Sequence, residues 1–113
     1  MKKIEAIIRP EKFQALRKAL SAAGIGGLTV TEAAGTGKQK GQKGIFRGTT
    51  FQLQLLPKIK VETIVEEQRL DEILDIIIKN CSTGNIGDGK IFVSPIEETI
   101  RIRTGERGKV AVL

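Results

Sequence analysis

The feature that most constrains this chain is an internal duplication. When the sequence is shifted by 57 residues, the strand-like segment 3–8 aligns with segment 60–65. The apolar positions that follow also coincide, with Phe13, Leu16 and Leu20 over Leu70, Ile73 and Ile77. Both six-residue segments are rich in β-branched residues and largely alternate, as half-buried strands do, and both following segments have apolar residues at helical spacing. Each half is therefore predicted to begin as a strand and continue as a helix.

Turn-forming residues extend this pattern to two β-α-β units. In the first half Pro10 suits the first turn of a helix, Gly24 suits its C-terminal end, and residues 28–31 are predicted to return as a strand. In the second half the helix is predicted over about residues 68–80 and the return strand over 91–95. Two such units in series predict an α+β fold, a ferredoxin-like double βαβ (split β-α-β) sandwich with both helices on one face of the sheet.

The remaining segments complete a single predicted domain over residues 1–113. A chain of this length buries roughly two thirds of its unfolded surface, so it can hold a core and can gain stability by oligomerising. Residues 99–104 are predicted to form an extra C-terminal strand. A long loop is predicted between the halves, over about residues 36–55, because its glycines and cations leave little apolar surface to bury. Its descending side, residues 51–55, alternates and is strand-like as far as Pro57.

Composition excludes several classes of chemistry. The chain has no His, Trp or Tyr, so it lacks the imidazole used in most acid–base and nucleophilic mechanisms. Its single cysteine, Cys81, continues the apolar face of the second helix and is predicted to be a packed core thiol rather than a redox or metal site. No segment resembles a signal peptide or a membrane-spanning run, so a cytoplasmic location is expected.

The net charge of +6 is concentrated in one segment. Residues 33–61 contain no acidic residue, and the cations within them are Lys38, Lys40, Lys43, Arg47, Lys58 and Lys60. Elsewhere the basic and acidic residues balance. Clustered cations can bind nucleic acid through counterion release, so this function has to be weighed.

Residues 83–91 are the most informative motif for function. Gly84 and Gly89 are separated by four residues and followed by Lys90, which matches part of a P-loop, but Ile91 stands where the magnesium-binding Ser or Thr should be. The element order also differs, because this run leads from a helix into a strand. Its glycines still let consecutive backbone N–H groups converge on phosphate oxygens, with Lys90 adding charge. The motif predicts a nucleotide-binding loop that lacks the residues needed for hydrolysis. The alternative is a tight turn that needs glycine only for its backbone conformation.

A pair of arginines, Arg101 and Arg103, lies on the predicted C-terminal strand. Residues two apart on a strand project from one face, where two guanidinium groups can clamp a phosphate. The alternative is an exposed basic edge that discourages aggregation.

With these features in place, the chain closely resembles the PII nitrogen-regulatory signal-transduction proteins over essentially its full length. The resemblance rests on MKKIEAII at residues 1–8, GKQKG at 37–41, FRG at 46–48, TGNIGDGKI at 83–91 and IRIRTGE at 100–106. It implies a homotrimer that binds ATP or ADP in clefts between subunits and senses 2-oxoglutarate together with Mg-ATP. It also implies that the long loop contacts enzymes, regulators or ammonium channels.

The resemblance implies a set of nucleotide-binding residues contributed by two subunits. Those from one subunit that would hold the phosphates are Gly87, Asp88, Gly89 and Lys90, while Arg101 and Arg103 would reach in from its neighbour. The positions that would surround the nucleotide are Ile7, Thr29, Gly35, Gly37, Lys38, Gln39, Glu62 and Ile64, of which Ile7, Glu62 and Ile64 are equally compatible with ordinary sheet positions.

The resemblance also implies a 2-oxoglutarate pocket. Its residues would be Arg9, Gln39, Lys40, Gly41, Lys58 and Gly87, with Gln39 completing the Mg²⁺ shell and Lys58 pairing with the distal carboxylate of the ligand. An amide oxygen suits a hard cation and an ammonium suits a carboxylate. The sequence departs from the family at Thr36, where Phe is usual, and at Lys38, where Arg is usual, and the loss of a planar fork at Lys38 bears on 2-oxoglutarate affinity.

The loop departs from the family at its modification site. Phe51 stands where many bacterial members carry a tyrosine that is uridylylated or adenylylated, and a phenyl ring has no oxygen for nucleotidyl transfer. Thr49 and Thr50 lie where some relatives carry a modified serine. Arg47 matches an arginine that relatives insert into an ammonium channel, or it is an ordinary loop cation.

The sequence therefore predicts a non-enzymatic sensor in which ATP, ADP and 2-oxoglutarate stabilise different shapes of the loop. Two alternatives belong to other classes. A slow ATPase would use Lys90 and the arginine pair, but the only acid near them is Asp88 and no general base or two-carboxylate metal site accompanies it. A nucleic-acid-binding module would use the basic loop, which has too few aromatic residues for a stacking platform.

Overall fold

The computed structural model describes residues 1–38 and 53–112, and their elements follow the duplicated order. The first half consists of β1 (Lys2–Ile8), a 3-10 turn (Pro10–Lys12), α1 (Phe13–Ala22) and β2 (Thr29–Lys38). The second half consists of β3 (Leu53–Val65), a 3-10 turn (Glu67–Arg69), α2 (Leu70–Cys81) and β4 (Gly89–Pro95), and a short α3 (Lys109–Val112) follows.

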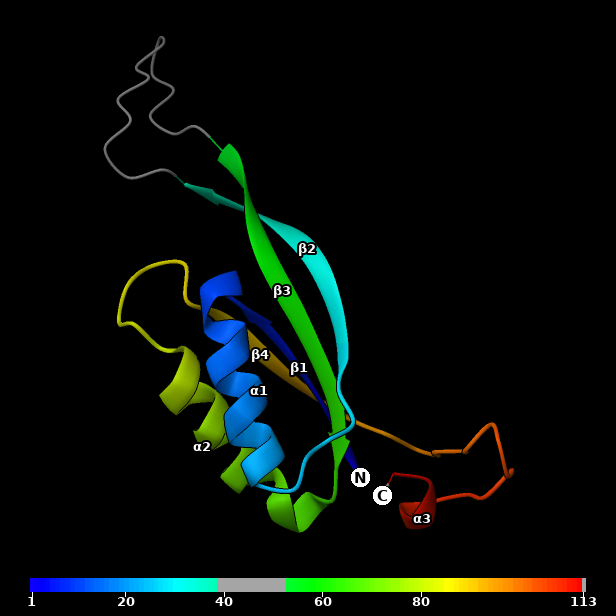
Figure 1. The fold of residues 1–113 in the computed structure, drawn as a ribbon. Helices are drawn as coiled ribbons and strands as arrows, with labels where there is room; N and C mark the ends of the chain where they lie inside the picture. The colour runs from blue at the N-terminus through cyan, green and yellow to red at the C-terminus, as the bar shows by residue number, and fades with distance from the viewer. Residues whose placement is uncertain (39–52, 113) are drawn as a thin grey trace, which may run out of the picture.

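The described strands form a four-stranded sheet in the order β2-β3-β1-β4, with every neighbouring pair antiparallel. The two duplicated strands pair at its centre, with Lys2 opposite Val65 and Ile8 opposite Ile59. The return strands flank them, and α1 and α2 pack side by side across one face (Figure 1). The predicted α+β, ferredoxin-like arrangement with both helices on one face is confirmed.

The core lies between this sheet face and the helices. Its buried members alternate along the strands and recur at helical spacing: Ile4, Ala6, Ile8, Val61 and Val65 from the sheet, and Leu16, Leu20, Ile73, Ile77 and Cys81 from the helices. Cys81 is a packed core thiol as predicted, and burial raises the pKa of that thiol above its ordinary value. Because period-2 strands and period-3.6 helices both direct their apolar residues inward, sequence periodicity alone identifies this core.

Both ends of the predicted long loop, residues 36–38 and 53–55, belong to β-strands. β2 continues to Lys38, which lies opposite Leu53 of β3, so the predicted boundaries at 36 and 55 were too wide at both sides. Backbone pairing requires no apolar side chains, which is why a glycine- and lysine-rich segment can extend a ladder. Pro57 also lies within β3, beyond the last β1 pair at Ile59, where only β2 flanks it and a proline without an N–H is tolerated. The predicted loop residues 39–52 lie outside the described part of the chain.

The predicted extra strand at residues 99–104 was wrong. Within the described residues, this segment has one isolated antiparallel bridge, between Ile100 and Arg107, around a tight turn. The Arg101 N–H donates to the Glu106 carbonyl and the Gly105 N–H donates to the Arg101 carbonyl. These local hydrogen bonds satisfy the backbone within the turn, so the alternating pattern of isoleucine and arginine does not form a ladder.

No helix in residues 1–38 or 53–112 combines the length and the apolar character needed to cross a bilayer.

Candidate functional site

The candidate site lies at one end of the sheet face that carries no helices. Since Ile4, Ala6 and Ile8 of β1 point into the core, strand alternation directs the residues between them to the opposite face. Following the strand register, the predicted site residues on that helix-free face are Ile7, Thr29, Gly35, Lys58, Glu62, Ile64 and Lys90. The structure therefore brings residues of all four described strands to a single surface.

Charged side chains on this face are paired with one another. Glu5 and Glu62 lie directly opposite each other on β1 and β3, an arrangement that would repel if it were uncompensated. The Lys3 ammonium lies 2.8 Å from a Glu62 carboxylate oxygen and 3.8 Å from Glu5, and Lys60 lies 3.8 Å from Glu62. The hydrogen bond from Lys3 holds the pKa of Glu62 below its usual value, and the same bond raises the pKa of Lys3.

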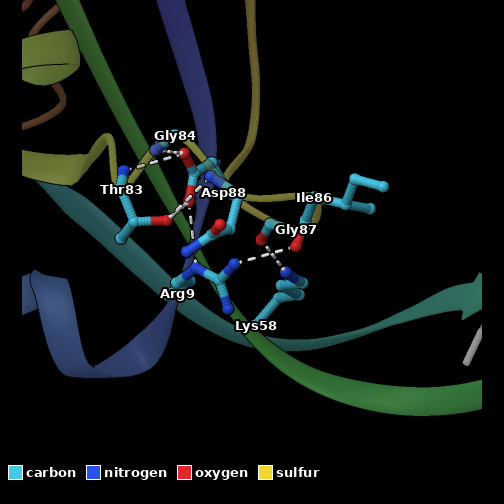
Figure 2. A network of polar contacts seen from close by, with 8 residues as sticks. Arg9, Lys58, Thr83, Gly84, Ile86, Gly87 and Asp88 are labelled. Carbon is cyan, nitrogen blue, oxygen red and sulfur yellow. Dashed lines mark hydrogen bonds and ion pairs between the residues drawn. The ribbon is translucent and has the colours of Figure 1, made fainter. Parts of the chain in front are cut away.

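The glycine loop, residues 83–89, connects α2 to β4 and is organised by one carboxylate. Asp88 accepts hydrogen bonds from the Thr83 N–H at 2.8 Å and the Gly84 N–H at 2.9 Å, both through Oδ2. Its Oδ1 accepts from the Thr83 hydroxyl and from Arg9 Nε at 3.1 Å (Figure 2). The Thr83 side chain is the main cause that lowers the pKa of Asp88 far below its usual value, and Arg9 adds to the effect.

Two cations from neighbouring strands bind carbonyl groups of the glycine loop. Arg9, just beyond β1, donates from Nη2 to the Ile86 carbonyl at 2.9 Å, and Lys58 of β3 donates from Nζ to the Gly87 carbonyl at 2.5 Å (Figure 2). The structure therefore brings together Arg9, Lys58 and Gly87, which the resemblance assigns to one ligand pocket, and adds Asp88 to them through its contact with Arg9.

The backbone of the glycine loop presents N–H donors. In a trans peptide the N–H points opposite to the C=O, so the Gly87 N–H points away from Arg9, which holds the Ile86 carbonyl. Within the described residues, neither the Ile86 N–H nor the Gly87 N–H has a hydrogen-bond acceptor. Consecutive N–H groups of this kind favour an anion.

Glycine is required where the loop meets β1. A Cβ on Gly89 would lie 1.7 Å from the Ile7 carbonyl oxygen, and Gly89 has a φ of +102°. Gly87, at φ +103°, would bring a Cβ within 3.2 Å of the Arg9 guanidinium. This close approach places Lys90, the first residue after the loop, opposite Ile7 on the helix-free face.

The two C-terminal arginines do not join this group within one copy of the chain. β4 runs from Gly89, opposite Ile8, to Pro95, opposite Lys2, so about 20 Å of strand separates the glycine loop from the segment that carries them. Arg101 instead donates to Glu106 at 2.8 Å and to the Val110 carbonyl at 2.7 Å. The expectation that Arg101 and Arg103 share one strand face was wrong, because they lie in a turn.

The described residues contain a cavity of about 200 Å³ beside the glycine loop, on the helix side of the sheet. Its lining includes the apolar residues Ile8, Ile77, Cys81 and Ile91, and also Asp88 and Lys90. Its mostly apolar wall does not suit a phosphate.

Several predicted site residues lie outside the described part of the chain, namely Gln39, Lys40, Gly41, Arg47, Thr49, Thr50 and Phe51. Gly37 and Lys38 are described as β2 backbone. In the described segments no group of three or more Cys, Asp or Glu residues is arranged to bind a metal, and the predicted magnesium ligand Gln39 falls outside them.

Sequence reasoning missed the part played by the side chains of Thr83 and Asp88 within the loop. The placement of Asp88 at the phosphates, which the resemblance implies, stays a prediction; in this structure its carboxylate accepts hydrogen bonds from Thr83, Gly84 and Arg9. A usable signal was present, because Thr and Asp flank a glycine-rich stretch and both side chains bond readily to nearby backbone.

Comparison with known proteins identifies the family. A family model described as "Nitrogen regulatory protein P-II" matches residues 1–106. The "Nitrogen regulatory protein P-II 2" of Methanothermobacter thermautotrophicus is 51% identical over 112 residues, covering 99% of this chain and 97% of the relative. The "Nitrogen regulatory protein P-II" of Azospirillum brasilense is 49% identical over 112 residues, covering 99% of this chain and 100% of the relative.

A solved structure shows the same fold. The PII protein of Arabidopsis thaliana, crystallised with citrate, is 38% identical and superposes with a TM-score of 0.79, covering 98% of this chain and 88% of that one. The relatives are named as regulatory proteins and not as enzymes, in agreement with the sequence prediction.

Proposed function

Because the chain belongs to the P-II nitrogen regulatory protein family, we propose that it is a cytoplasmic sensor that binds ATP or ADP, and 2-oxoglutarate with Mg-ATP. The observation that carries this proposal is the glycine loop. It presents the N–H groups of Ile86 and Gly87, which have no acceptor among the described residues; Lys90 follows it, and Arg9 and Lys58 lie against it. This arrangement suits a polyanion, and the adjoining helix-free face carries Ile7, Glu62 and Ile64, the positions that would surround the nucleoside.

The 2-oxoacid would be bound by Arg9, Gln39, Lys40, Gly41, Lys58 and Gly87, with Gln39 on the Mg²⁺. Arg9 and Lys58 lie together beside Gly87, which supports a carboxylate site there. The Arabidopsis relative was crystallised with citrate, a polycarboxylate, which also supports a small carboxylate ligand.

The nucleotide site would be completed by a second copy in a homotrimer. Arg101 and Arg103 lie beyond the far end of β4 from Lys90, so in this proposal they would reach the phosphates from another subunit. Charge-assisted contacts of this kind contribute about 1.5 to 3 kcal/mol each, which supports micromolar affinity.

Ligand occupancy would act on residues 39–52, which join β2 to β3. Lys58 lies on β3, the strand that follows this segment, and contacts the glycine loop, so a ligand that binds Lys58 would act on the strand from which the segment leads. The regulated partner would be an ammonium channel or an enzyme of nitrogen metabolism, contacted through Arg47.

A slow ATPase is less well supported than a sensor. The acid nearest to Lys90 in the glycine loop is Asp88, whose carboxylate is occupied by four donors and whose pKa lies far below its usual value. Such a carboxylate is a poor general base.

Isothermal titration calorimetry with ADP, with Mg-ATP, and with Mg-ATP plus 2-oxoglutarate tests the proposal. We expect dissociation constants in the micromolar range for the nucleotides and tighter 2-oxoglutarate binding when Mg-ATP is present. Rapid ATP turnover would support the enzyme instead, and salt-dependent binding of an oligonucleotide would support the nucleic-acid module. A monomer indifferent to millimolar adenine nucleotides would refute the sensor.

A mixing experiment tests the shared site. Lys90→Gln and Arg103→Gln should each abolish most ADP binding. When the two variants are unfolded and refolded together, some clefts combine an intact Lys90 with an intact Arg103 of the next subunit. We expect part of the binding capacity to return on mixing, whereas a site within one copy would regain none.

A further inference from the structure

We propose that Asp88 and Thr83 are positioning residues that hold the glycine loop in its anion-binding shape, and that the Asp88 carboxylate is not itself a contact to phosphate or Mg²⁺. The proposal rests on the proposed function only for the identity of the anion. The geometry of the loop is independent of that function.

The carboxylate of Asp88 has no acceptor capacity left for a ligand. An ionised carboxylate offers about four lone-pair sites on its two oxygens. In this structure four donors occupy Asp88: the N–H and hydroxyl of Thr83, the Gly84 N–H, and Arg9 Nε. A metal ion or a ribose hydroxyl at Asp88 would therefore displace a donor that holds the loop.

These bonds close the loop on itself. They tie Thr83 and Gly84, where the chain leaves α2, to Asp88, where it enters β4 (Figure 2). The chain between them contains two glycines at positive φ, Gly84 at +84° and Gly87 at +103°, whose backbones are intrinsically permissive. Without the closure, these glycines would have to be ordered each time an anion binds, and the entropic cost of that ordering would weaken binding.

Thr83 contributes through Asp88 and through the turn. Its hydroxyl donates to the Asp88 carboxylate and accepts from the Asn85 N–H at 3.2 Å. The Thr83 side chain therefore links the start of the glycine loop both to residue 85 and to the loop's end at Asp88. Arg9 joins the same network to β1 through its bonds to Asp88 and Ile86. The loop is thereby fixed relative to the sheet that carries Lys90.

The direction in which Asp88→Asn changes nucleotide affinity separates this proposal from a purely electrostatic effect. A carboxylate beside a polyanion repels it, so replacing Asp88 by neutral asparagine would strengthen nucleotide binding if charge alone mattered. If Asp88 holds the loop, Asp88→Asn weakens binding, because the asparagine amide group cannot accept all four donors.

The test measures ADP affinity without Mg²⁺, and then ATP affinity with and without Mg²⁺, by calorimetry. The variants are Asp88→Asn, Thr83→Val and Thr83→Ser, with Asp75→Asn on the exposed side of α2 as the matched control. We expect ADP to bind Asp88→Asn and Thr83→Val about tenfold more weakly, as the loss of one to two net hydrogen bonds implies. Thr83→Ser and Asp75→Asn should bind like the parent, and Mg²⁺ should change ATP affinity by the same factor in Asp88→Asn as in the parent.

Three results would overturn the proposal: tighter ADP binding by Asp88→Asn, parent-like binding by Thr83→Val, or an Asp88→Asn defect confined to the Mg²⁺-dependent part of ATP binding. Urea unfolding of each variant shows that the measured chains are folded.

A second readout keeps the proposal testable if the parent binds no adenine nucleotide and the proposed function fails. The Thr83 and Gly84 amides, which donate to Asp88, should exchange with solvent slowly in the parent and at least about tenfold faster in Asp88→Asn. Fast exchange of both amides in the parent would refute the positioning role whatever the ligand.

Discussion

The connections that follow the two helices differ, although they occupy corresponding places in a duplicated fold. The first joins α1 to β2 and contains Gly24, Gly26 and Gly27, and a Cβ on Gly26 or Gly27 would meet no atom of the described residues within 4 Å. The second is the glycine loop, which packs against the Ile7 carbonyl and is closed by Asp88. Gly26 and Gly27 have room for a side chain, whereas Gly89 has none, because its backbone lies directly against the Ile7 carbonyl at a positive φ.

The residue after each duplicated strand explains much of the contrast. Arg9 follows β1 and corresponds, 57 residues later, to Glu66 after β3. Arg9 binds the glycine loop, whereas Glu66 accepts from Gln68 at 2.7 Å and pairs with Lys109 at 3.3 Å. The chain therefore has a cation at one strand end and an anion at the corresponding other end, so the two halves share a fold but not the same charge beside the connection.

The largest expected effect comes from placing a side chain in each connection. Gly89→Ala forces a Cβ against the Ile7 carbonyl at a positive φ, and we expect it to lower the free energy of unfolding by about 3 kcal/mol or more. Gly26→Ala, in open space, should change it by less than about 1 kcal/mol. Urea unfolding measures both, and equal effects would remove the contrast between the connections.

In contrast to the connections, the two helices should lose similar stability when corresponding core residues are truncated. Leu20 and Ile77 correspond in the duplication and are both buried, at 0% and 3% exposure. Truncation of either one to alanine should cost about 3 kcal/mol, through lost burial and the cavity left behind. A difference of more than about 2 kcal/mol between them would show that the halves contribute unequally to the core.

Exchanging the charge at the strand ends tests the site directly. Arg9→Gln removes the cation that holds Asp88 and Ile86, and we expect 2-oxoglutarate in the presence of Mg-ATP to bind at least about tenfold more weakly. Glu66→Gln, at the corresponding position, should leave affinity within about twofold. Calorimetry compares the two, and a similar loss in both would place the carboxylate ligand elsewhere.

The smallest effect near neutral pH is expected from titration of Asp88. Since the Thr83 bonds hold its folded-state pKa below the ordinary value of about 3.9, its contribution to stability is fully present above pH 4 and is lost only as pH falls through the lower folded-state pKa. The first connection contains no acidic residue and has no such transition. Carbon NMR of the Asp88 carboxyl group should show that it stays ionised below the ordinary aspartate value of about 3.9. A titration midpoint at or above that value would contradict the closed loop.

Sequence reasoning succeeded where a pattern repeats. The strand and helix periods of segments 3–8, 60–65 and their following helices identified the core and the sheet architecture, and the glycine spacing at 84–89 identified the loop. It failed at residues 99–104, where an alternating pattern forms a turn closed by bonds between Arg101 and Glu106. A turn held by local hydrogen bonds over a few residues has no repeating sequence pattern from which it could be predicted.

The sequence by itself determined the duplicated β-α-β order, the inward faces, the absence of histidine chemistry and the glycine-rich candidate for an anion site, because residue types and spacing suffice for these. Only the tertiary structure decided that Arg9 and Lys58, which are far apart in the chain, bind the carbonyls of residues 86 and 87, and that donors from the loop and from Arg9 occupy the Asp88 carboxylate. Such contacts depend on strand register and on which residues meet across the sheet, and these arise from the packing of the whole chain rather than from any local pattern.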